Sequence, residues 1–203
     1  AVYSYKNYPK FTNSIYNTSA QGIQQPQAAA VVIDQHTGEL RAIVGGKQPP
    51  TGKRQYNRAF QGKLPLGSSI KPLSVYGPFI EMGYPGGIII ENIPAPIEGW
   101  TGGKYPYPRN YGGGSFEGPT TVHRGITKSL NVVAGRIVLD RVGTKYSADK
   151  LRELGLTDVT EQPADLSLGT YGNNMIEVAG AYAAIANKGV YQEPISFTRV
   201  LDK

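Results

Sequence analysis

The stretch Leu66-Gly67-Ser68-Ser69-Ile70-Lys71-Pro72 carries more structural information than any other part of this chain of 203 residues. Proline is tolerated in the first turn of a helix but not in its interior, so Pro72 predicts a helix that begins close to Ser68. Residues three apart in a helix share one face, which places the Ser68 hydroxyl near the Lys71 amine. A serine becomes a nucleophile when a base takes its proton, and a desolvated lysine can be that base. The stretch therefore predicts a nucleophile–base pair at a helix N-terminus, where backbone N–H groups favour a developing oxyanion.

The chain contains a second serine–lysine pair with the same spacing, Ser147-Ala148-Asp149-Lys150. Here a structural interpretation is favoured. Ser147 has the character of a helix N-cap, Asp149 would lie in the first turn, and Gly155 would end a short amphipathic helix. We expect this copy to have no catalytic role.

A second polar motif, Ser129-Leu130-Asn131, interrupts an apolar pattern of helical spacing that runs from Thr120 to Val142. One interpretation is a short break in a buried helix, with Asn131 starting the next helix as its N-cap. The other interpretation places the motif beside Ser68 and Lys71, where a second hydroxyl relays a proton and an amide binds a peptide carbonyl.

Further segments, in their order along the chain, resemble the transpeptidase domain of class A penicillin-binding proteins. In the first half these segments are Gln27 to Asp34, Thr37 to Gly46, Asn57-Arg58-Ala59 and Leu66 to Pro72. In the second half they are Tyr107-Pro108-Arg109-Asn110, Lys128-Ser129-Leu130-Asn131, Leu168-Gly169 and Ala181 to Gly189. The resemblance implies that residues 27–203 form the N-terminal portion of the transpeptidase domain, and that residues 1–26 form a linker or extension.

The resemblance also implies a fold and a reaction. The expected fold is α/β, a three-layer sandwich in which helices flank a mainly antiparallel central sheet, incomplete in this chain. The implied activity is that of a serine D,D-transpeptidase, which crosslinks peptidoglycan through an acyl-enzyme on Ser68 and is the target of β-lactam antibiotics. Ser68, Lys71 and Ser129 would be catalytic and Asn131 would bind substrate, with neither a cofactor nor a metal.

One motif of the family is missing, because no Lys-Thr-Gly or Lys-Ser-Gly follows Asn131. The family carries this motif on a strand that faces the serine. We therefore expect a chain that is truncated or cleaved before the motif, with the remaining C-terminal part of the same domain supplying it.

The resemblance implies several partners and a location. The partners are peptidoglycan stem peptides, β-lactam antibiotics and, in the full-length protein, an upstream glycosyltransferase domain. The implied location is the outer face of the bacterial cytoplasmic membrane, with an anchoring segment outside this chain.

A net charge of +6 suits anionic lipid or acidic wall polymer. Nucleic acid is disfavoured because the basic residues are dispersed and no reader motif is present. His36 and His123 are isolated and there is no cysteine, so a metal site has little support.

Two alternative functions stay open. A D,D-carboxypeptidase or β-lactamase would use the same serine and lysine but would deacylate with water. A catalytically silent wall-binding module would keep the fold without the reaction, and the missing third motif suits it.

The periodicity of the sequence predicts alternating strands and helices. The expected strands cover residues 28–33 and 39–44, joined as a hairpin, and 194–201. The expected helices cover residues 69–82, 121–128, 132–142, 147–154 and 175–188. Residues 84–119, rich in Gly, Pro and Tyr, are predicted to be mostly loop.

Overall fold

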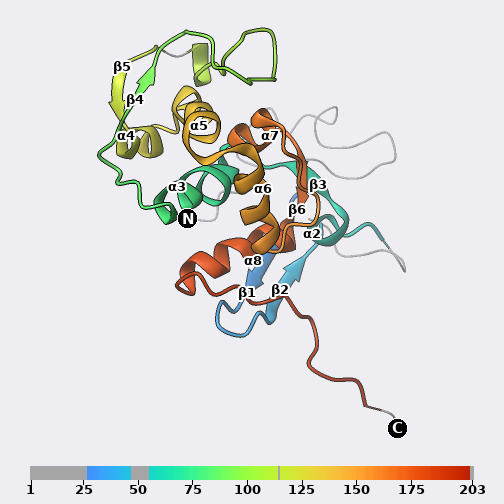
Figure 1. Ribbon diagram of the computed structural model, residues 1–203. Coiled ribbons are helices and arrows are strands. Elements are labelled where there is room, and N and C mark those ends of the chain that lie inside the picture. Colours follow the sequence, from blue (N-terminus) through green and yellow to red (C-terminus); the bar gives the residue numbers. More distant parts are fainter. Residues whose placement is uncertain (1–26, 47–54, 114, 202–203) are drawn as a thin grey trace, which may run out of the picture.

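The computed structural model describes residues 27–46, 55–113 and 115–201 (Figure 1). The expected linker over residues 1–26 lies outside the described residues. Helices and short strands alternate along the chain, which confirms the predicted α/β class. The strands form three antiparallel pairs, β1–β2, β3–β6 and β4–β5. Within the described ranges, no helix is long and apolar enough to cross a membrane.

The predicted hairpin is present as β1 (Ala30–Ile33) and β2 (Leu40–Val44), which pair antiparallel. Asp34 organises the turn, because its carboxylate accepts hydrogen bonds from two backbone N–H groups of the turn and its own carbonyl accepts one from Gly38. Gly38 has a φ of +76°, a conformation that glycine adopts without strain. Helix α8 (Met175–Ala186) packs against β1 and so covers the hairpin (Figure 1).

The helix predicted over residues 69–82 is present but irregular. It begins as a 3₁₀ turn, η3 (Gly67–Ile70), widens into a π-helical turn, η4 (Pro72–Tyr76), and ends as α3 (Gly77–Glu81). Pro72 and Pro78 lack the N–H that a regular α-helix uses, which explains the irregular turns.

The core lies among this helix and four others: α5 (Asn131–Ile137), its π-helical continuation η6 (Val138–Val142), α6 (Thr144–Glu153) and α7 (Pro163–Leu168). The largest fully buried apolar side chains come from these elements, their loops and the first residue of α4 (Val122–Thr127): Ile70, Leu73, Val75, Phe79, Val122, Val132, Val133, Ile137, Val138, Leu156 and Leu166. The core is therefore helical, and the buried cluster contains no residue of the β1–β2 hairpin.

The structure corrects three details predicted from the sequence. The region 84–119 contains β4 (Ile89–Asn92), which pairs with β5 (Gly118–Thr121) ahead of the short helix α4 (Val122–Thr127). The strand predicted over 194–201 is reduced to one parallel bridge between Glu39 and Ile195, and the segment beyond it extends away from the body (Figure 1). Few apolar residues of that segment contact the body, because Phe197, Val200 and Leu201 are exposed.

The third correction concerns the second serine–lysine pair. Helix α6 begins at Thr144 rather than at Ser147, so Ser147 is not its N-cap. Ser147 is instead fully buried inside the helix and donates a hydrogen bond to the carbonyl of Ser74 at 2.7 Å. The expectation of a structural role is consistent with this contact, although the capping argument was wrong.

Candidate active site

Lys71 is the centre of the site. Its side chain is only 2 % exposed, yet its ammonium group contacts no carboxylate among the described residues. Nζ donates to the Ser129 carbonyl at 2.8 Å, to Ser129 Oγ at 3.1 Å and to Asn131 Oδ1 at 2.7 Å. The structure therefore brings together three of the four residues that the sequence predicted for the site.

The buried, neutral surroundings of Lys71 lower the pKa of its ammonium group. Burial lowers its pKa from 10.5 to about 8, because no charge compensates the desolvation of the ammonium. The three hydrogen bonds also suit the neutral amine, which has two donors and one lone pair. In that state Nζ donates to the Ser129 carbonyl and to Asn131, while the Ser129 hydroxyl donates to the lone pair. The site thus accepts Lys71 in both protonation states.

Ser68 lies in η3, three residues before Lys71, and its side chain is exposed. Its hydroxyl makes no hydrogen bond to any described residue, and all the donors of Lys71 are directed to the Ser129–Asn131 side. Ser68 therefore shares the helical turn of Lys71, as the sequence predicted, without contacting the amine. Its hydroxyl is free to meet a ligand.

The turn that carries Ser68 is held from behind by a close approach of two glycines. Gly67 has a φ of +57° and donates its N–H to the Gly169 carbonyl at 3.0 Å. A Cβ on Gly169 would overlap the carbonyl oxygen of Gly67. Strand β3 (Lys63–Pro65) leads into the turn and pairs with β6 (Gly172–Asn174), so the segments on both sides of this contact are tied together.

Ser129 connects α4 to α5 and has a φ of +52°, one of two positive values among the described non-glycine residues. Serine rarely adopts this conformation, and such backbone outliers tend to occur at functional sites. The positive φ lets both the carbonyl and the hydroxyl of Ser129 reach Lys71. The sequence indicated a break in the helix here but not its geometry.

Asn131 is the first residue of α5 rather than its N-cap, which corrects one of the two interpretations left open. Its side-chain oxygen accepts from Lys71, and its Nδ2 donates to the Arg109 carbonyl at 2.8 Å. One proton of Nδ2 is left for another acceptor.

The N-terminus of α5 is capped by a residue from a distant loop. The N-cap residue Leu130 has no polar side chain, and Asn110 Oδ1 accepts instead from the N–H of Asn131 at 2.8 Å and of Val132 at 3.3 Å. The segment around Asn110 carries part of the family resemblance, but this capping role was not predicted. An isolated asparagine in a loop gives no local signal of the helix that it caps.

A second unforeseen contact comes from α8. The Tyr182 hydroxyl donates to the carbonyl of Ser69 at 2.6 Å, and the Ser69 hydroxyl donates to the Leu66 carbonyl at 2.6 Å. These two bonds attach the turn around Ser68 to α8 and to its own preceding residue. The Ser69 hydroxyl is thus used in a hydrogen bond within the turn, in contrast to the Ser68 hydroxyl.

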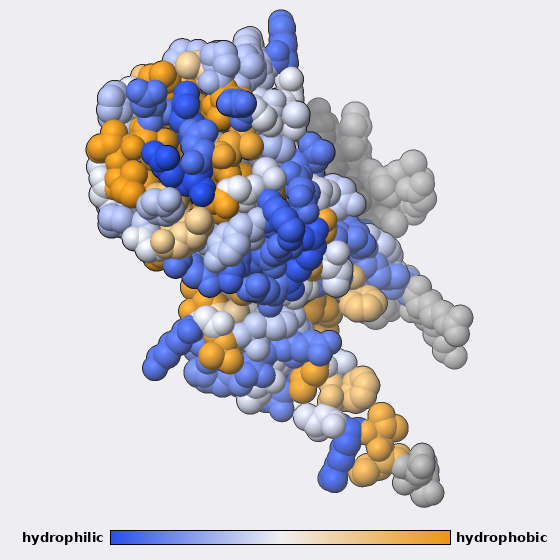
Figure 2. All heavy atoms as spheres, viewed as in Figure 1, coloured by the Kyte–Doolittle hydropathy of each residue, from blue (hydrophilic) through white to orange (hydrophobic). Residues whose placement is uncertain are grey.

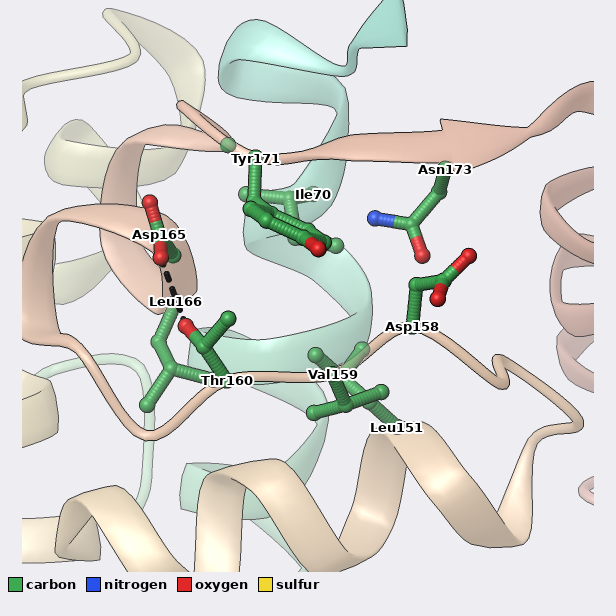
Figure 3. A pocket seen from close by; sticks show the side chains of 10 residues that line it. Ile70, Leu151, Asp158, Val159, Thr160, Asp165, Leu166, Tyr171 and Asn173 are labelled. Atoms are coloured by element: carbon green, nitrogen blue, oxygen red, sulfur yellow. Dashed lines mark hydrogen bonds between the residues drawn. The ribbon is translucent and has the colours of Figure 1, made fainter. Parts of the chain in front are cut away.

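A small cavity of about 10 Å³ lies behind the turn, lined by Ile70, Leu166, Tyr171, Asn173 and others (Figure 3). This volume is about the space that one water occupies. Asn173 Oδ1 is buried without a hydrogen-bond partner in the described part of the chain, while Thr160 donates to Asp165 (Figure 3). The cavity does not include Ser68 or Lys71, so it is separate from the candidate site.

No cluster of three metal-ligating side chains occurs among residues 27–46, 55–113 and 115–201. The arrangement is that of an α/β protein in which an exposed serine and a buried lysine share one helical turn, the pairing by which an amine activates a hydroxyl for acyl transfer. Over residues 28–202 the chain matches the family described as the penicillin binding protein transpeptidase domain. The chain belongs to this family.

Several known proteins are similar to the chain. Penicillin-binding protein 1A of Clostridium acetobutylicum is 39% identical over 195 residues, which cover 90% of this chain and 24% of that protein. Penicillin-binding protein 1A of Neisseria meningitidis serogroup B is 33% identical over 172 residues, covering 82% of this chain and 21% of that protein. The chain thus spans about a quarter of the length of these curated relatives.

Solved structures give the same result for the fold. The crystal structure of penicillin-binding protein 1A from Haemophilus influenzae has a TM-score of 0.67 at 28% identity, covering 84% of this chain and 26% of that one. The PonA1 protein from Mycobacterium tuberculosis in complex with penicillin V has a TM-score of 0.68 at 26% identity, covering 83% of this chain and 46% of that one. These similarities confirm the predicted family and the penicillin-binding-protein type of α/β fold.

Proposed function

We propose that this chain is part of a peptidoglycan D,D-transpeptidase, with Ser68 as its nucleophile and β-lactams as its inhibitors. The observation that carries the proposal is Lys71, a buried amine with a lowered pKa, three residues after an exposed serine. The family match and the PonA1 complex with penicillin V support it.

The proposed reaction has two steps. The Ser68 hydroxyl attacks the carbonyl between the two terminal D-alanines of a stem peptide, an acyl-enzyme forms, and D-alanine leaves. An amine from a neighbouring stem peptide then attacks the ester, forms the crosslink and restores the Ser68 hydroxyl. The Ser68 N–H lies in the first turn of η3, where helical N–H groups lack intrahelical partners, and would bind the developing oxyanion.

Proton transfer is assigned to Lys71 and Ser129. Neutral Lys71 takes the proton of Ser68 as the substrate enters, because catalytic hydrogen bonds often form only in the substrate complex. The Ser129 hydroxyl, 3.1 Å from Nζ, passes a proton to the departing amine. Asn131 binds the stem-peptide amide through the Nδ2 proton that Arg109 leaves unused.

The wider setting belongs to the same proposal. Residues 27–203 would be the N-terminal portion of the transpeptidase domain and residues 1–26 a linker. The remainder of the domain would supply the Lys-Thr/Ser-Gly motif, and the full-length protein a glycosyltransferase domain. The whole would act at the outer face of the cytoplasmic membrane, held there by an anchor outside this chain.

The test is covalent labelling by benzylpenicillin of the protein that includes the remainder of the domain, followed by intact-mass spectrometry and peptide mapping. We expect one stable penicilloyl adduct on Ser68, lost in Ser68→Ala and retained in the matched control Ser69→Ala, whose hydroxyl serves only the Leu66 carbonyl. Labelling that persists in Ser68→Ala contradicts the proposal. Rapid turnover of penicillin would favour the hydrolase alternative, and absence of any adduct would favour the silent wall-binding module.

A further inference from the structure

Asn110 lies outside the serine and lysine motifs, yet it is joined to the Lys71 site through two consecutive residues of its own loop. Its Oδ1 caps α5 at the N–H groups of Asn131 and Val132. The carbonyl of the preceding residue, Arg109, accepts from Asn131 Nδ2 at 2.8 Å. Backbone and side chain of Asn131 are thus both held by this loop, which leaves Asn131 Oδ1 directed at Lys71.

The orientation of Asn110 is itself determined by a buried partner. Because Oδ1 accepts two backbone N–H groups, Nδ2 must be the donor, and it donates to Asn92 Oδ1 on β4 at 2.8 Å. Asn92 is 0 % exposed and Asn110 is 7 % exposed. The pair is therefore shielded from water, and its hydrogen bonds cannot be exchanged freely for bonds to solvent.

Stability alone does not account for this pair. Asn92 Nδ2 is buried with no hydrogen-bond partner among the described residues, an arrangement that disfavours folding. A helix cap requires only one acceptor at the helix N-terminus, which a serine or aspartate next to α5 would supply without a buried amide pair. An unsatisfied buried group in a folded protein calls for an explanation, and a role in the site is one.

The loop is also packed tightly against α5. A Cβ on Gly135 would lie 3.0 Å from Pro108 Cγ and 3.3 Å from Trp100 Cζ3, so the glycine leaves room for a close approach of the loop to the helix. Pro108, two residues before Asn110, is thus in close contact with α5.

We propose that Asn110, oriented by Asn92, is a positioning residue of this site: it places the turn of Ser129 and the amide of Asn131 against Lys71. Asn110 touches neither the nucleophile nor the proton-carrying groups and acts through Asn131. The inference rests on the proposed function for its link to acylation. The placement of Asn131 against Lys71 by Asn110 does not depend on that function and can be tested without it.

The test compares Asn110→Ala and Asn110→Asp with a control, Asp34→Ala. Asp34 makes a similar contact in the turn of the β1–β2 hairpin, where its side-chain oxygen accepts from the backbone N–H groups of His36 and Thr37. Two quantities are measured in each variant: the pH titration of the Lys71 ε-carbon by ¹³C NMR, assigned with Lys71→Arg, and the rate of acylation by benzylpenicillin across pH. Urea unfolding measures the loss of stability in parallel.

Asn110→Ala removes the cap and admits water to the amine, so we expect the Lys71 titration midpoint to rise from about 8 towards the ordinary value. Acylation should slow by about 10- to 100-fold at every pH, the effect of a misplacement on the order of 1 Å. Asp34→Ala should also lose stability, because two backbone N–H groups lose their acceptor, while the Lys71 titration and the acylation rate stay those of the wild type.

Asn110→Asp separates geometry from charge. Its carboxylate keeps the cap, and Asn92 can rotate to donate its unpartnered Nδ2 to it. The added negative charge should raise the Lys71 midpoint by about one pH unit. Acylation should therefore be slow near neutral pH and return to the wild-type rate above the new midpoint, whereas Asn110→Ala stays slow.

Two results overturn the inference. If Asn110→Ala matches Asp34→Ala in the Lys71 titration and in the acylation rate, Asn110 is a helix cap and nothing more. If Asn110→Asp stays as slow as Asn110→Ala at high pH, placement through the cap is wrong. Should the wild type not be acylated at all, the proposed function fails, and the Lys71 titrations still decide the positioning role.

Discussion

Lys71 is a basic side chain that is 2 % exposed and surrounded by neutral acceptors, an arrangement with a cost in the folded state. Its ammonium loses most of its hydration and gains no counter-charge, so its pKa falls to about 8. A lysine that is partly neutral near physiological pH is what a general base requires. The same burial that weakens the fold therefore prepares the amine for proton transfer.

This cost makes stability depend on pH. Between about pH 8 and the unfolded value of 10.5, the unfolded chain binds a proton at Lys71 and the folded chain does not. The free energy of unfolding should therefore rise with pH across this window, by about 3 kcal/mol from this residue. Lys71→Met should lack the rise. The measurement is the difference in urea unfolding free energy between the two proteins at about pH 7 and about pH 10, and a constant difference contradicts the prediction.

Proton transfer by Lys71 has its own pH signature. If neutral Lys71 is the base, the rate of acylation by benzylpenicillin should rise as pH increases through about 8 and then level off. Lys71→Arg, which stays charged, should acylate slowly at every pH. If the acylation rate of the wild type is constant between about pH 6 and pH 10, a group other than Lys71 accepts the Ser68 proton.

At the scale of elements, the turn that carries Ser68 depends on α7 and on the β3–β6 pair. Gly169 ends α7 in the left-handed conformation, with a φ of +64°, and its carbonyl accepts the Gly67 N–H. This contact holds the end of α7 directly behind the nucleophile. This backbone contact acts together with the side-chain hydrogen bonds of Tyr182 and Ser69 that hold the same turn.

Substitution of Gly169 measures the contact. Gly169→Ala should destabilise the protein by about 1–2 kcal/mol for the left-handed backbone and by a further 1–3 kcal/mol for the overlap with Gly67. The control is Gly83→Ala at the end of α3, where φ is +87° and no atom lies within 4 Å of the added Cβ. Urea unfolding should show a larger loss for Gly169→Ala, with slower penicillin acylation in that variant alone. Equal losses of unfolding free energy in the two variants would mean that the turn around Ser68 shifts to accommodate the added Cβ without further destabilisation.

At the scale of the molecule, the helical body and the β1–β2 hairpin differ in burial. The buried cluster is built from the helical segments, their loops and Ile90 of β4. In the hairpin, by contrast, Val32, Ile43 and Val44 are between two fifths and about half exposed. Figure 2 shows polar and apolar side chains mixed over the molecular surface, with apolar ones gathered over the β4–β5 end, where Ile89 and Ile126 are exposed. The helical body is therefore better buried than the hairpin.

Hydrogen exchange should reflect this difference. Regions with few buried apolar contacts open at lower free energies than a packed core. Amides of β1 and β2 should exchange through local openings, whereas those of α5 should approach the global unfolding free energy. Native-state exchange in increasing low concentrations of denaturant measures both. Equal opening free energies in the two regions would show that the hairpin unfolds only together with the helical body.

Local chemistry accounts for much of what could be predicted from the sequence. Pro72 and the spacing of Ser68 and Lys71 led to the helical turn, and two β-rich runs joined by a short turn led to the β1–β2 hairpin. The strands β4 and β5 were missed because they lie in a Gly- and Pro-rich region whose four-residue strands have little periodicity. Ser147 was misplaced because a buried serine bonded to Ser74 has the same local pattern as a cap.

The residue types, the spacing of Ser68 and Lys71 and the order of the motifs can be read from the chain directly, because none of them depends on which distant elements pack together. The groups that meet Lys71 cannot be read in this way, because residues 58 and 60 positions away reach it through the turn between α4 and α5. The same holds for the contact of Asn110 with the N-terminus of α5 and for that of Gly169 with Gly67. Such contacts follow from the packing of whole elements, and burial then lowers the pKa of Lys71, which no local pattern encodes.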